Sequence, residues 1–251
     1  MAHAPSGRTP NHALESGSFK SKIRGAFRPR EGHIGLVKMT GDLFDGAPCD
    51  VPLAPGAMLL GAFARPVEGP LIAAVQQVAE RAPFRTMVTR GGHRMSVAMT
   101  NCGTAGWVTD RAGYRYEACD PESGRPWPPM PEAFGDLARQ AAARAGFDGF
   151  APDACLINRY EPGARMSLHQ DKDERDFDAP IVSVSLGLPA VFLFGGTRRT
   201  DAPVRVPLAH GDVVVWGAVS RLRYHGVLPL KDGHHPLLGG YRINLTLRLA
   251  T

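Results

Sequence analysis

Two segments in the first 150 residues place apolar side chains at helical spacing. After a Gly-Pro pair, apolar positions recur at i, i+4, i+7, i+8 and i+11 through residues 71–82, and a proline then ends the pattern. Residues 131–145 repeat the arrangement, with a proline at the start and Gly146 placed to cap the end. A single apolar stripe on each segment predicts a helix that packs one face against a core.

From residue 154 onward the pattern changes to short segments that alternate or are wholly apolar. Turn sequences such as GGTRRTDAP and AHGD separate them, and the segments read ACLINRY, PIVSVSLGL, AVFLF, VRVPL, DVVVW, RLRYHGVLPL and YRINLTLRLA. Short strands without helical patterns between them favour an antiparallel sandwich or barrel. We therefore expect a mainly β fold with flanking helices (α+β) and a β core at about residues 152–251.

A long segment between the two predicted helices, at about residues 85–130, lacks a sustained period. It holds glycine pairs, scattered aromatic residues and the proline-rich sequence PWPPMP. Two interpretations remain open at this point. The segment is either a loop-rich lid over a site or an irregular hairpin layer that covers the core.

Composition bounds the domain organisation. The chain has 251 residues, 43% hydrophobic, which is enough for one domain, expected at 41–251. The chain has 29 basic and 24 acidic residues. Residues 1–40 hold seven of the basic and two of the acidic ones, so the rest of the chain carries 22 of each and is neutral. Because residues 1–40 are also rich in Gly, Ser, Pro and Arg, we expect a disordered basic N-terminal extension.

Cysteine usage and apolar runs bear on location. The four cysteines show no C-x-x-C spacing, so neither a zinc site nor a disulfide framework is indicated. No stretch reaches the roughly 18 apolar residues of a membrane span, and no signal peptide is recognisable. A cytoplasmic monomer without membrane contact is the expectation.

The sequence SLHQDKDE, residues 167–174, contains a candidate metal site. In an extended segment His169 and Asp171 point to the same face, about 7 Å apart along the chain. A lone H-x-D also arises by chance in surface turns, and His225, in RLRYHGVLPL, is either a third ligand or a buried histidine with satisfied hydrogen bonds. Two histidines and one carboxylate on a β scaffold would form the facial triad of non-haem iron(II).

The last predicted strand, YRINLTLRL, alternates apolar and polar residues, so Arg242 and Arg248 share its polar face. Such a face is often simply solvated. The alternative is a clamp for a carboxylate, which the planar guanidinium binds in a bidentate way.

Longer stretches carry a family resemblance. LINRYEPGARMSLHQDKDE, IVSVSLGLPAVFLFGG, HGDVVVWG, SRLRYHGVLPL and YRINLTLR closely resemble the bacterial AlkB-type alkylated-DNA repair dioxygenases, and the likeness runs from about Met39 to the end. It implies a double-stranded β-helix (jelly-roll) core with N-terminal helices and a nucleotide-recognition lid. Residues 1–38 would then be an added basic arm or a product of start-codon choice.

The resemblance also implies a cofactor set of Fe(II), the cosubstrate 2-oxoglutarate, and O2. It assigns Fe(II) to His169, Asp171 and His225. It assigns the distal carboxylate of 2-oxoglutarate to Arg242, Tyr160 and Asn244, and the end nearer the metal to Asn158 and Arg248.

The implied activity is DNA repair by oxidative demethylation of 1-methyladenine and 3-methylcytosine in single-stranded or duplex DNA, with release of succinate, CO2 and formaldehyde. Single-stranded DNA is the expected preference because no base pair must be opened. Matching positions imply that Trp107 stacks on the flipped base, opposite the His225 ring, that Asp173 contacts its exocyclic amine and that Tyr114 contacts a phosphate. Three further positions match near the lesion: Thr89, Met99 and Arg199.

Two lid positions depart from the family pattern, Arg90 in place of a proline and His93 in place of an aromatic hydroxyl. The contacts to phosphate are therefore expected to differ.

Two other functions remain open. The same chemistry could act on RNA, tRNA or protein, or the chain could be a non-catalytic nucleic-acid-binding β-barrel.

Overall fold

The computed structural model describes residues 49–251. The predicted disordered extension of residues 1–40 lies outside this range, and so does the choice between an added basic arm and a product of start-codon choice for residues 1–38. Within it, no helix is long and apolar enough to cross a membrane.

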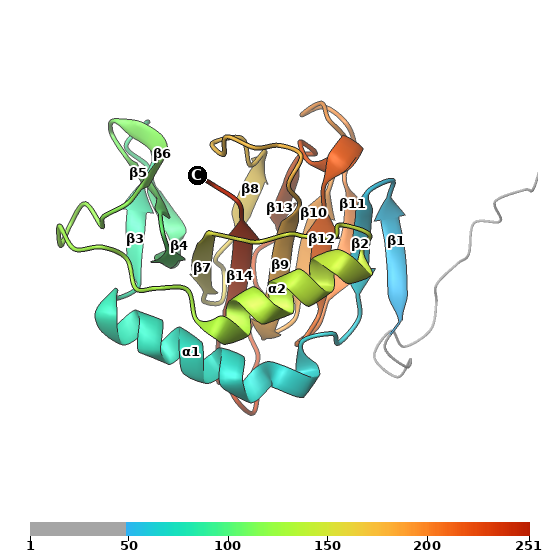
Figure 1. The fold of residues 1–251 in the computed structure, drawn as a ribbon, viewed down its shortest axis with the longest axis horizontal. Helices are drawn as coiled ribbons and strands as arrows, with labels where there is room; N and C mark the ends of the chain where they lie inside the picture. Colours follow the sequence, from blue (N-terminus) through green and yellow to red (C-terminus); the bar gives the residue numbers. More distant parts are fainter. Residues whose placement is uncertain (1–48) are drawn as a thin grey trace, which may run out of the picture. The chain divides into compact units, whose positions relative to one another are not determined.

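Antiparallel strands form a large sheet that runs through the domain (Figure 1). Its order is β1-β2-β12-β9-β14-β7-β4-β3. The strands are β1 (Asp50–Ala54), β2 (Ala57–Leu60), β3 (Arg85–Val88), β4 (Arg94–Gly103), β7 (Ala154–Tyr160), β9 (Ile181–Gly187), β12 (Val213–Trp216) and β14 (Arg242–Arg248). The central strand β14 pairs with β7 on one side and β9 on the other, and all seven of its residues are buried.

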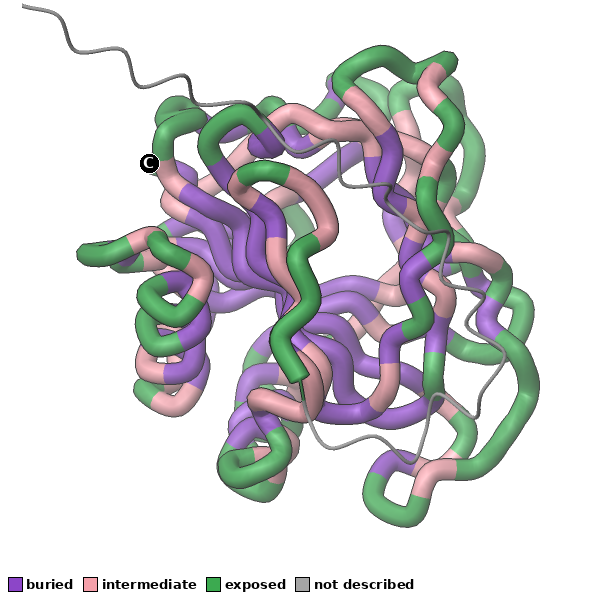
Figure 2. Tube along the Cα trace, turned by 90° about the vertical axis from the view of Figure 1, so that its right-hand side faces the viewer, coloured by how far each residue is buried: buried purple, intermediate pink, exposed green. Residues whose placement is uncertain are grey.

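A second sheet has the order β11-β10-β13-β8, with strands β8 (Met166–His169), β10 (Ala190–Phe194), β11 (Val204–Leu208) and β13 (His225–Val227). One apolar cluster joins residues of both sheets, including Leu156 and Trp216 from the large sheet and Phe192 and Phe194 from the small one. The central strands are accordingly buried while the connecting loops are exposed (Figure 2). Two facing antiparallel sheets confirm the predicted jelly-roll, and each of the seven strand segments predicted after residue 154 contains a strand.

Both predicted helices form and lie on the same side of the large sheet (Figure 1). Helix α1 spans Glu68–Arg81 and α2 spans Glu132–Arg144, close to the predicted bounds, and Gly146 beyond α2 has the positive φ (88°) that favours glycine. Their apolar stripes pack on the face of β14 that carries Ile243, Leu245 and Leu247. The opposite face of β14, with its arginines, therefore points between the two sheets.

The segment at residues 85–130 is more regular than its sequence suggested. Strands β3 and β4 belong to the large sheet, and β5 (Gly106–Asp110) and β6 (Gly113–Glu117) form a separate hairpin. β4 buries polar residues, so its sequence lacks the apolar alternation typical of a strand. Thr100 donates to the Ala82 carbonyl, and Asn101 bonds to the backbone of Trp107. Two short 3-10 helices complete the elements, η1 (Arg65–Val67) and η2 (Ala218–Ser220).

Candidate functional site

A cavity of about 50 Å³ lies between the two sheets. Side chains from β7, β9, β12 and β14 of the large sheet line one wall, and residues of β8, β10 and β13 of the small sheet line the other. Eight of the predicted residues line it: Asn158, Tyr160, His169, Asp171, His225, Arg242, Asn244 and Arg248. The tertiary structure thus brings the predicted metal and cosubstrate residues into one cavity.

Strand pairing brings the two histidines together. His169 ends β8 and lies in register with His225 on the neighbouring strand β13, with 4.4 Å between the ring centroids. Asp171 follows two residues later on the same side, and each histidine Nε2 is 3.6 Å from one of its carboxylate oxygens. One ligand atom from each residue lies within 4.8 Å of the others, which is close enough to bind a single ion.

Each imidazole is oriented as a metal ligand by the hydrogen bond that its Nδ1 makes to a backbone carbonyl. Nδ1 of His169 lies 2.8 Å from the Ser167 carbonyl, and Nδ1 of His225 lies 3.0 Å from the Arg223 carbonyl. Because a carbonyl only accepts, Nδ1 carries the proton and the Nε2 lone pair faces Asp171. Burial, with His225 nearby, lowers the pKa of His169 to about 4, so the ring is neutral at pH 7.

Asp171 is held in its ionised form by Arg248. Nε and Nη2 of this arginine donate to Asp171 Oδ2 at 3.1 and 2.6 Å. Burial alone would raise the pKa of Asp171, but Arg248 and the two histidines hold it well below its ordinary value. Two imidazoles and one carboxylate therefore face the same small space, which is the donor set that suits iron(II).

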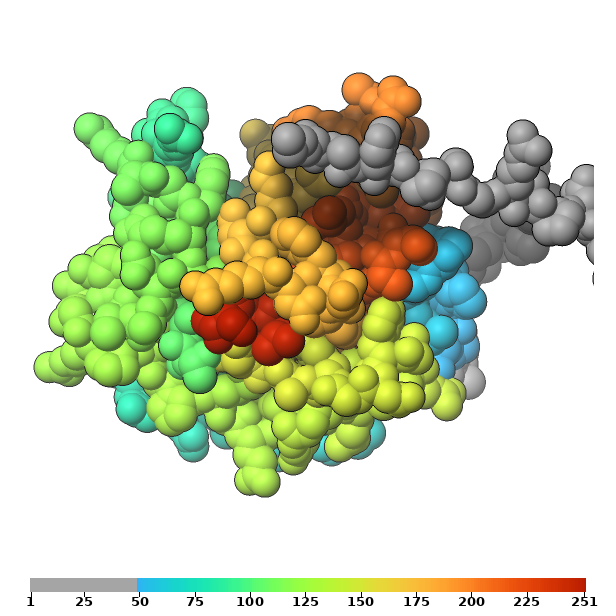
Figure 3. Space-filling view, turned by 45° about the horizontal axis from the view of Figure 1, so that its top comes forward, coloured from blue at the N-terminus to red at the C-terminus, as the bar shows by residue number. Residues whose placement is uncertain are grey.

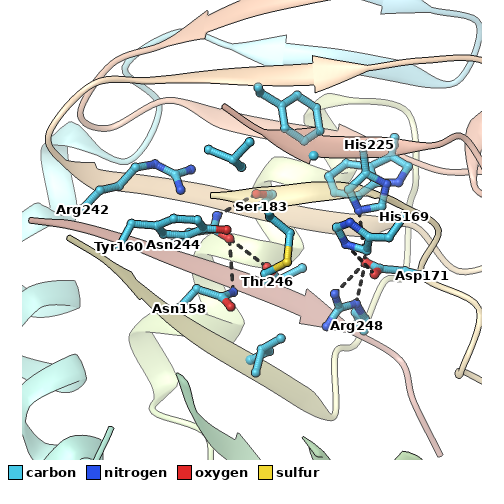
Figure 4. Close-up of a pocket in the computed structure, with 16 residues that line it drawn as sticks. Asn158, Tyr160, His169, Asp171, Ser183, His225, Arg242, Asn244, Thr246 and Arg248 are labelled. Atoms are coloured by element: carbon cyan, nitrogen blue, oxygen red, sulfur yellow. Dashed lines mark hydrogen bonds and ion pairs between the residues drawn. The ribbon is translucent and has the colours of Figure 1, made fainter. Parts of the chain in front are cut away.

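At the other end of the cavity, Arg242 offers donors that no protein atom uses (Figure 4). The residue is 1% exposed, its Nη2 donates to Ser185 Oγ at 2.9 Å, and the Tyr160 ring lies 5.1 Å from its Cζ. Its Nε and Nη1 are buried without a partner. Burying a cation with unused donors is costly, so this guanidinium fits an anionic ligand such as a carboxylate.

Amide and hydroxyl groups line the wall between these two ends. Asn244 donates to Ser183 Oγ (2.8 Å) and the Val184 carbonyl, and its Oδ1 accepts from Thr246 (3.0 Å). Asn158 Oδ1 is buried without a partner. The polar face of β14 is therefore the wall of a buried cavity, and the solvated-face interpretation of its arginines is wrong.

Comparison with known proteins identifies the family. Residues 56–248 match the 2OG-Fe(II) oxygenase superfamily. The chain belongs to this superfamily. Within it the chain is an AlkB-type dioxygenase. It is 60% identical to the alpha-ketoglutarate-dependent dioxygenase AlkB of Salmonella typhimurium. The 210 aligned residues are 83% of this chain and 97% of the relative. Identity to AlkB of Escherichia coli is 59% over the same shares of both chains.

A solved structure agrees with the fold. "The structure of OsALKBH1" superposes with a TM-score of 0.71 at 30% identity and covers 80% of this chain and 99% of that one. Members of the superfamily use Fe(II), 2-oxoglutarate and O2, and the histidine–carboxylate triad and free guanidinium of this dioxygenase fit the first two.

The β5–β6 hairpin carries two of the predicted substrate-binding side chains, Trp107 and Tyr114. Trp107 stacks on Tyr114 with 5.7 Å between ring centroids, and its Nε1 donates to Asp173 Oδ2 at 2.8 Å. Asp173 and Tyr114 also line an outer pocket of about 520 Å³ beside the end of the chain. The structure thus places Trp107 of β5 in direct contact with Asp173, which lies on the loop that follows Asp171.

The remaining predicted residues do not line the cavity. Thr89 and His93 close the β3–β4 turn through hydrogen bonds to each other's backbone. Met99 is fully buried in the cluster between the sheets, and Arg199 lies over the Tyr224 ring at 5.8 Å.

Sequence reasoning missed several residues that support the site. Ser183 and Ser185 position Asn244 and Arg242, and the period-two alternation in IVSVSLG could have placed both on the cavity face. Glu174 and Arg221 are buried near Asp171, and no spacing in the sequence connects them.

Proposed function

We propose that this protein repairs DNA by oxidative removal of N-linked methyl groups from damaged bases such as 1-methyladenine and 3-methylcytosine. The observation that carries the proposal is the pairing, in one buried cavity, of the metal-ligand triad with the unpartnered guanidinium of Arg242. The 60% identity to AlkB supports the choice of substrate.

In this proposal His169, Asp171 and His225 hold Fe(II), and the distal carboxylate of 2-oxoglutarate binds Arg242. Tyr160 and Asn244 flank that carboxylate, while Asn158 and Arg248 lie nearer the metal. When bound, the iron and 2-oxoglutarate use O2 to hydroxylate the methyl group, giving succinate and CO2, and the hydroxymethyl group leaves as formaldehyde. Arg248 has a further role because it keeps Asp171 ionised and oriented.

The lid side chains would select the base. A methyl group on the pairing edge gives adenine or cytosine a positive charge, which favours an aromatic and anionic pocket. Trp107 would stack on the flipped base and Asp173 would accept from its exocyclic amine, replacing the hydrogen bond that it now accepts from Trp107. Tyr114 would contact a phosphate, and three more residues would lie near the lesion strand: Thr89, Met99 and Arg199.

Strandedness and location belong to the same proposal. Single-stranded DNA avoids the cost of opening a base pair, so we infer that it is the preferred substrate. The four free cysteines fit action in a reducing cytoplasm. We infer separately that the protein acts as a monomer. RNA remains the main alternative substrate because flipped bases are similar in both polymers.

The test is mass analysis of a single-stranded oligonucleotide that carries one 1-methyladenine, after incubation with protein, Fe(II), 2-oxoglutarate and O2. We expect the methyl mass to disappear with the wild type and to persist with Asp171→Ala. Succinate formation without demethylation would point to another substrate such as RNA or protein. If no succinate forms, the non-catalytic binding protein is the better description.

A further inference from the structure

The connection between β8 and β9 carries the residues that matter most for the proposed chemistry but has little order of its own. Asp171 and Asp173 both lie in it, yet no helix, strand or backbone-to-backbone hydrogen bond orders residues 171–179. In Figure 3 this amber segment lies beside the green β5–β6 hairpin and the red end of the chain. Its shape must therefore depend on contacts from side chains of other elements.

Arg221 makes those contacts at the beginning, middle and end of the segment. It follows η2, is 2% exposed, and donates from Nη1 to the Asp171 carbonyl at 2.8 Å. Nη2 donates to Glu174 Oε2 at 3.1 Å, and Nε donates to the Ala179 carbonyl at 3.1 Å. The Phe177 ring covers the guanidinium, 5.4 Å from Cζ.

We propose that Arg221 is a positioning residue, one that fixes the shape of residues 171–179 and so sets where Asp171 and Asp173 point. The guanidinium is planar, and its donors have fixed relative directions. Three acceptors bound to this one group are therefore held at fixed positions relative to each other. Lysine carries the same charge on a single nitrogen and cannot hold the three acceptors in this arrangement.

The same group connects the segment to the lid. Glu174, whose side chain is 2% exposed, also accepts from Tyr116 on β6 at 2.7 Å and faces Arg248 Nε at 3.3 Å. Removing Arg221 would leave a buried carboxylate with one arginine fewer and two carbonyls without their donor. The selectivity part of this inference rests on the proposed function, because it assumes that Asp173 contacts the base.

Limited trypsin digestion followed by mass spectrometry tests the positioning directly. Lys172 and Arg175 are exposed cleavage sites inside the segment. In both Arg221→Met and Arg221→Lys we expect cleavage after these two residues to become roughly 10-fold faster than in the wild type, because the segment opens locally. Arg223→Lys is the matched control, since the guanidinium of Arg223 binds the Gly195 carbonyl instead, and its digestion should match the wild type.

Kinetics supply a readout that a merely structural role would not change. For Arg221→Lys we expect the preference for the cationic 1-methyladenine over the neutral 1-methylguanine, as a ratio of kcat/KM, to fall roughly 10- to 100-fold. An equal loss on both substrates, unchanged cleavage of the two bonds, or cleavage that spreads along the whole chain would each overturn the positioning role. If the wild type demethylates neither substrate, the proposed function fails and the digestion alone decides on Arg221.

Discussion

At the scale of single residues, the site depends on buried polar side chains that lack some of their hydrogen-bond partners. Arg242 keeps two nitrogens without a protein partner while being 1% exposed, and Asn158 keeps its side-chain oxygen free. A folded protein retains few such groups because each costs free energy. Their concentration along one wall of the cavity marks where a polar ligand completes the hydrogen bonds.

Replacing Arg242 tests this directly. In Arg242→Met we expect the KM for 2-oxoglutarate, measured by succinate formation, to rise at least about 30-fold, because losing one partner of a buried charged pair costs roughly 2–5 kcal/mol. Arg205→Met, on the exposed side of β11, is the matched control and should leave this KM unchanged. An unchanged KM in Arg242→Met would remove this arginine from the cosubstrate site.

At the scale of elements, two hydrogen bonds fasten the β5–β6 hairpin to the segment after Asp171. Trp107 donates to Asp173, and Tyr116 donates to Glu174 at the other edge of the hairpin. Burial raises the pKa of Tyr116, so this residue stays a hydroxyl donor throughout the physiological range. The hairpin is thus attached to two consecutive acidic residues, and its position is linked to the metal site.

The Tyr116 contact can be removed with little change in volume. In Tyr116→Phe we expect the KM for the alkylated oligonucleotide to rise roughly 10-fold, since a hydrogen bond to a charged group contributes about 1.5–3 kcal/mol. The KM for 2-oxoglutarate in the same variant is the internal control and should stay constant. A parallel rise in both values would show that the hydroxyl supports the cavity and not the position of the β5–β6 hairpin.

The β3–β4 turn presents Arg90, which departs from the family pattern, as an exposed residue. In Arg90→Ala we expect weaker binding of oligonucleotides and a shallower dependence of the binding constant on salt, by about 0.7 to 0.9 in slope for one lost phosphate contact. Binding titrations at several salt concentrations measure the slope. An unchanged slope would exclude Arg90 from phosphate contact.

At the scale of the whole molecule, the central strands β12, β9 and β14 of the large sheet are buried on both faces. The helices cover one face with an apolar cluster, and the small sheet covers the other around the cavity. Two buried carboxylates and two buried arginines form ion pairs beside the cavity: Asp171, Glu174, Arg221 and Arg248.

The cavity exists only in the folded domain. Ligands that bind in it should therefore stabilise the folded state against unfolding.

Thermal unfolding measures this stabilisation. With Mn(II) and 2-oxoglutarate, each at about 100 times its Kd, we expect each ligand to add about 2.7 kcal/mol, and hence Tm to rise by roughly 5–10 °C per ligand. Asp171→Ala should lose the response to Mn(II), and Arg242→Met should lose the response to 2-oxoglutarate. A full response to both ligands in either variant would contradict the assigned ligand sets.

The sequence alone determined both helices, the seven strand segments after residue 154 and the residues of β14 that share a face, because each follows from local periodicity. For residues 85–130 the sequence left a loop-rich lid and a hairpin layer open and did not locate β3 and β4, because Thr100 and Asn101 are buried polar residues whose partners lie in other elements.

Only the tertiary structure decided that the polar face of β14 is buried and that Arg221 organises the segment around Asp171. Register between β8 and β13 set His225 beside His169, and the covering sheet removed Arg242 from water. These relations join residues distant in the chain. They arise from strand pairing and packing, which no short stretch of sequence specifies by itself.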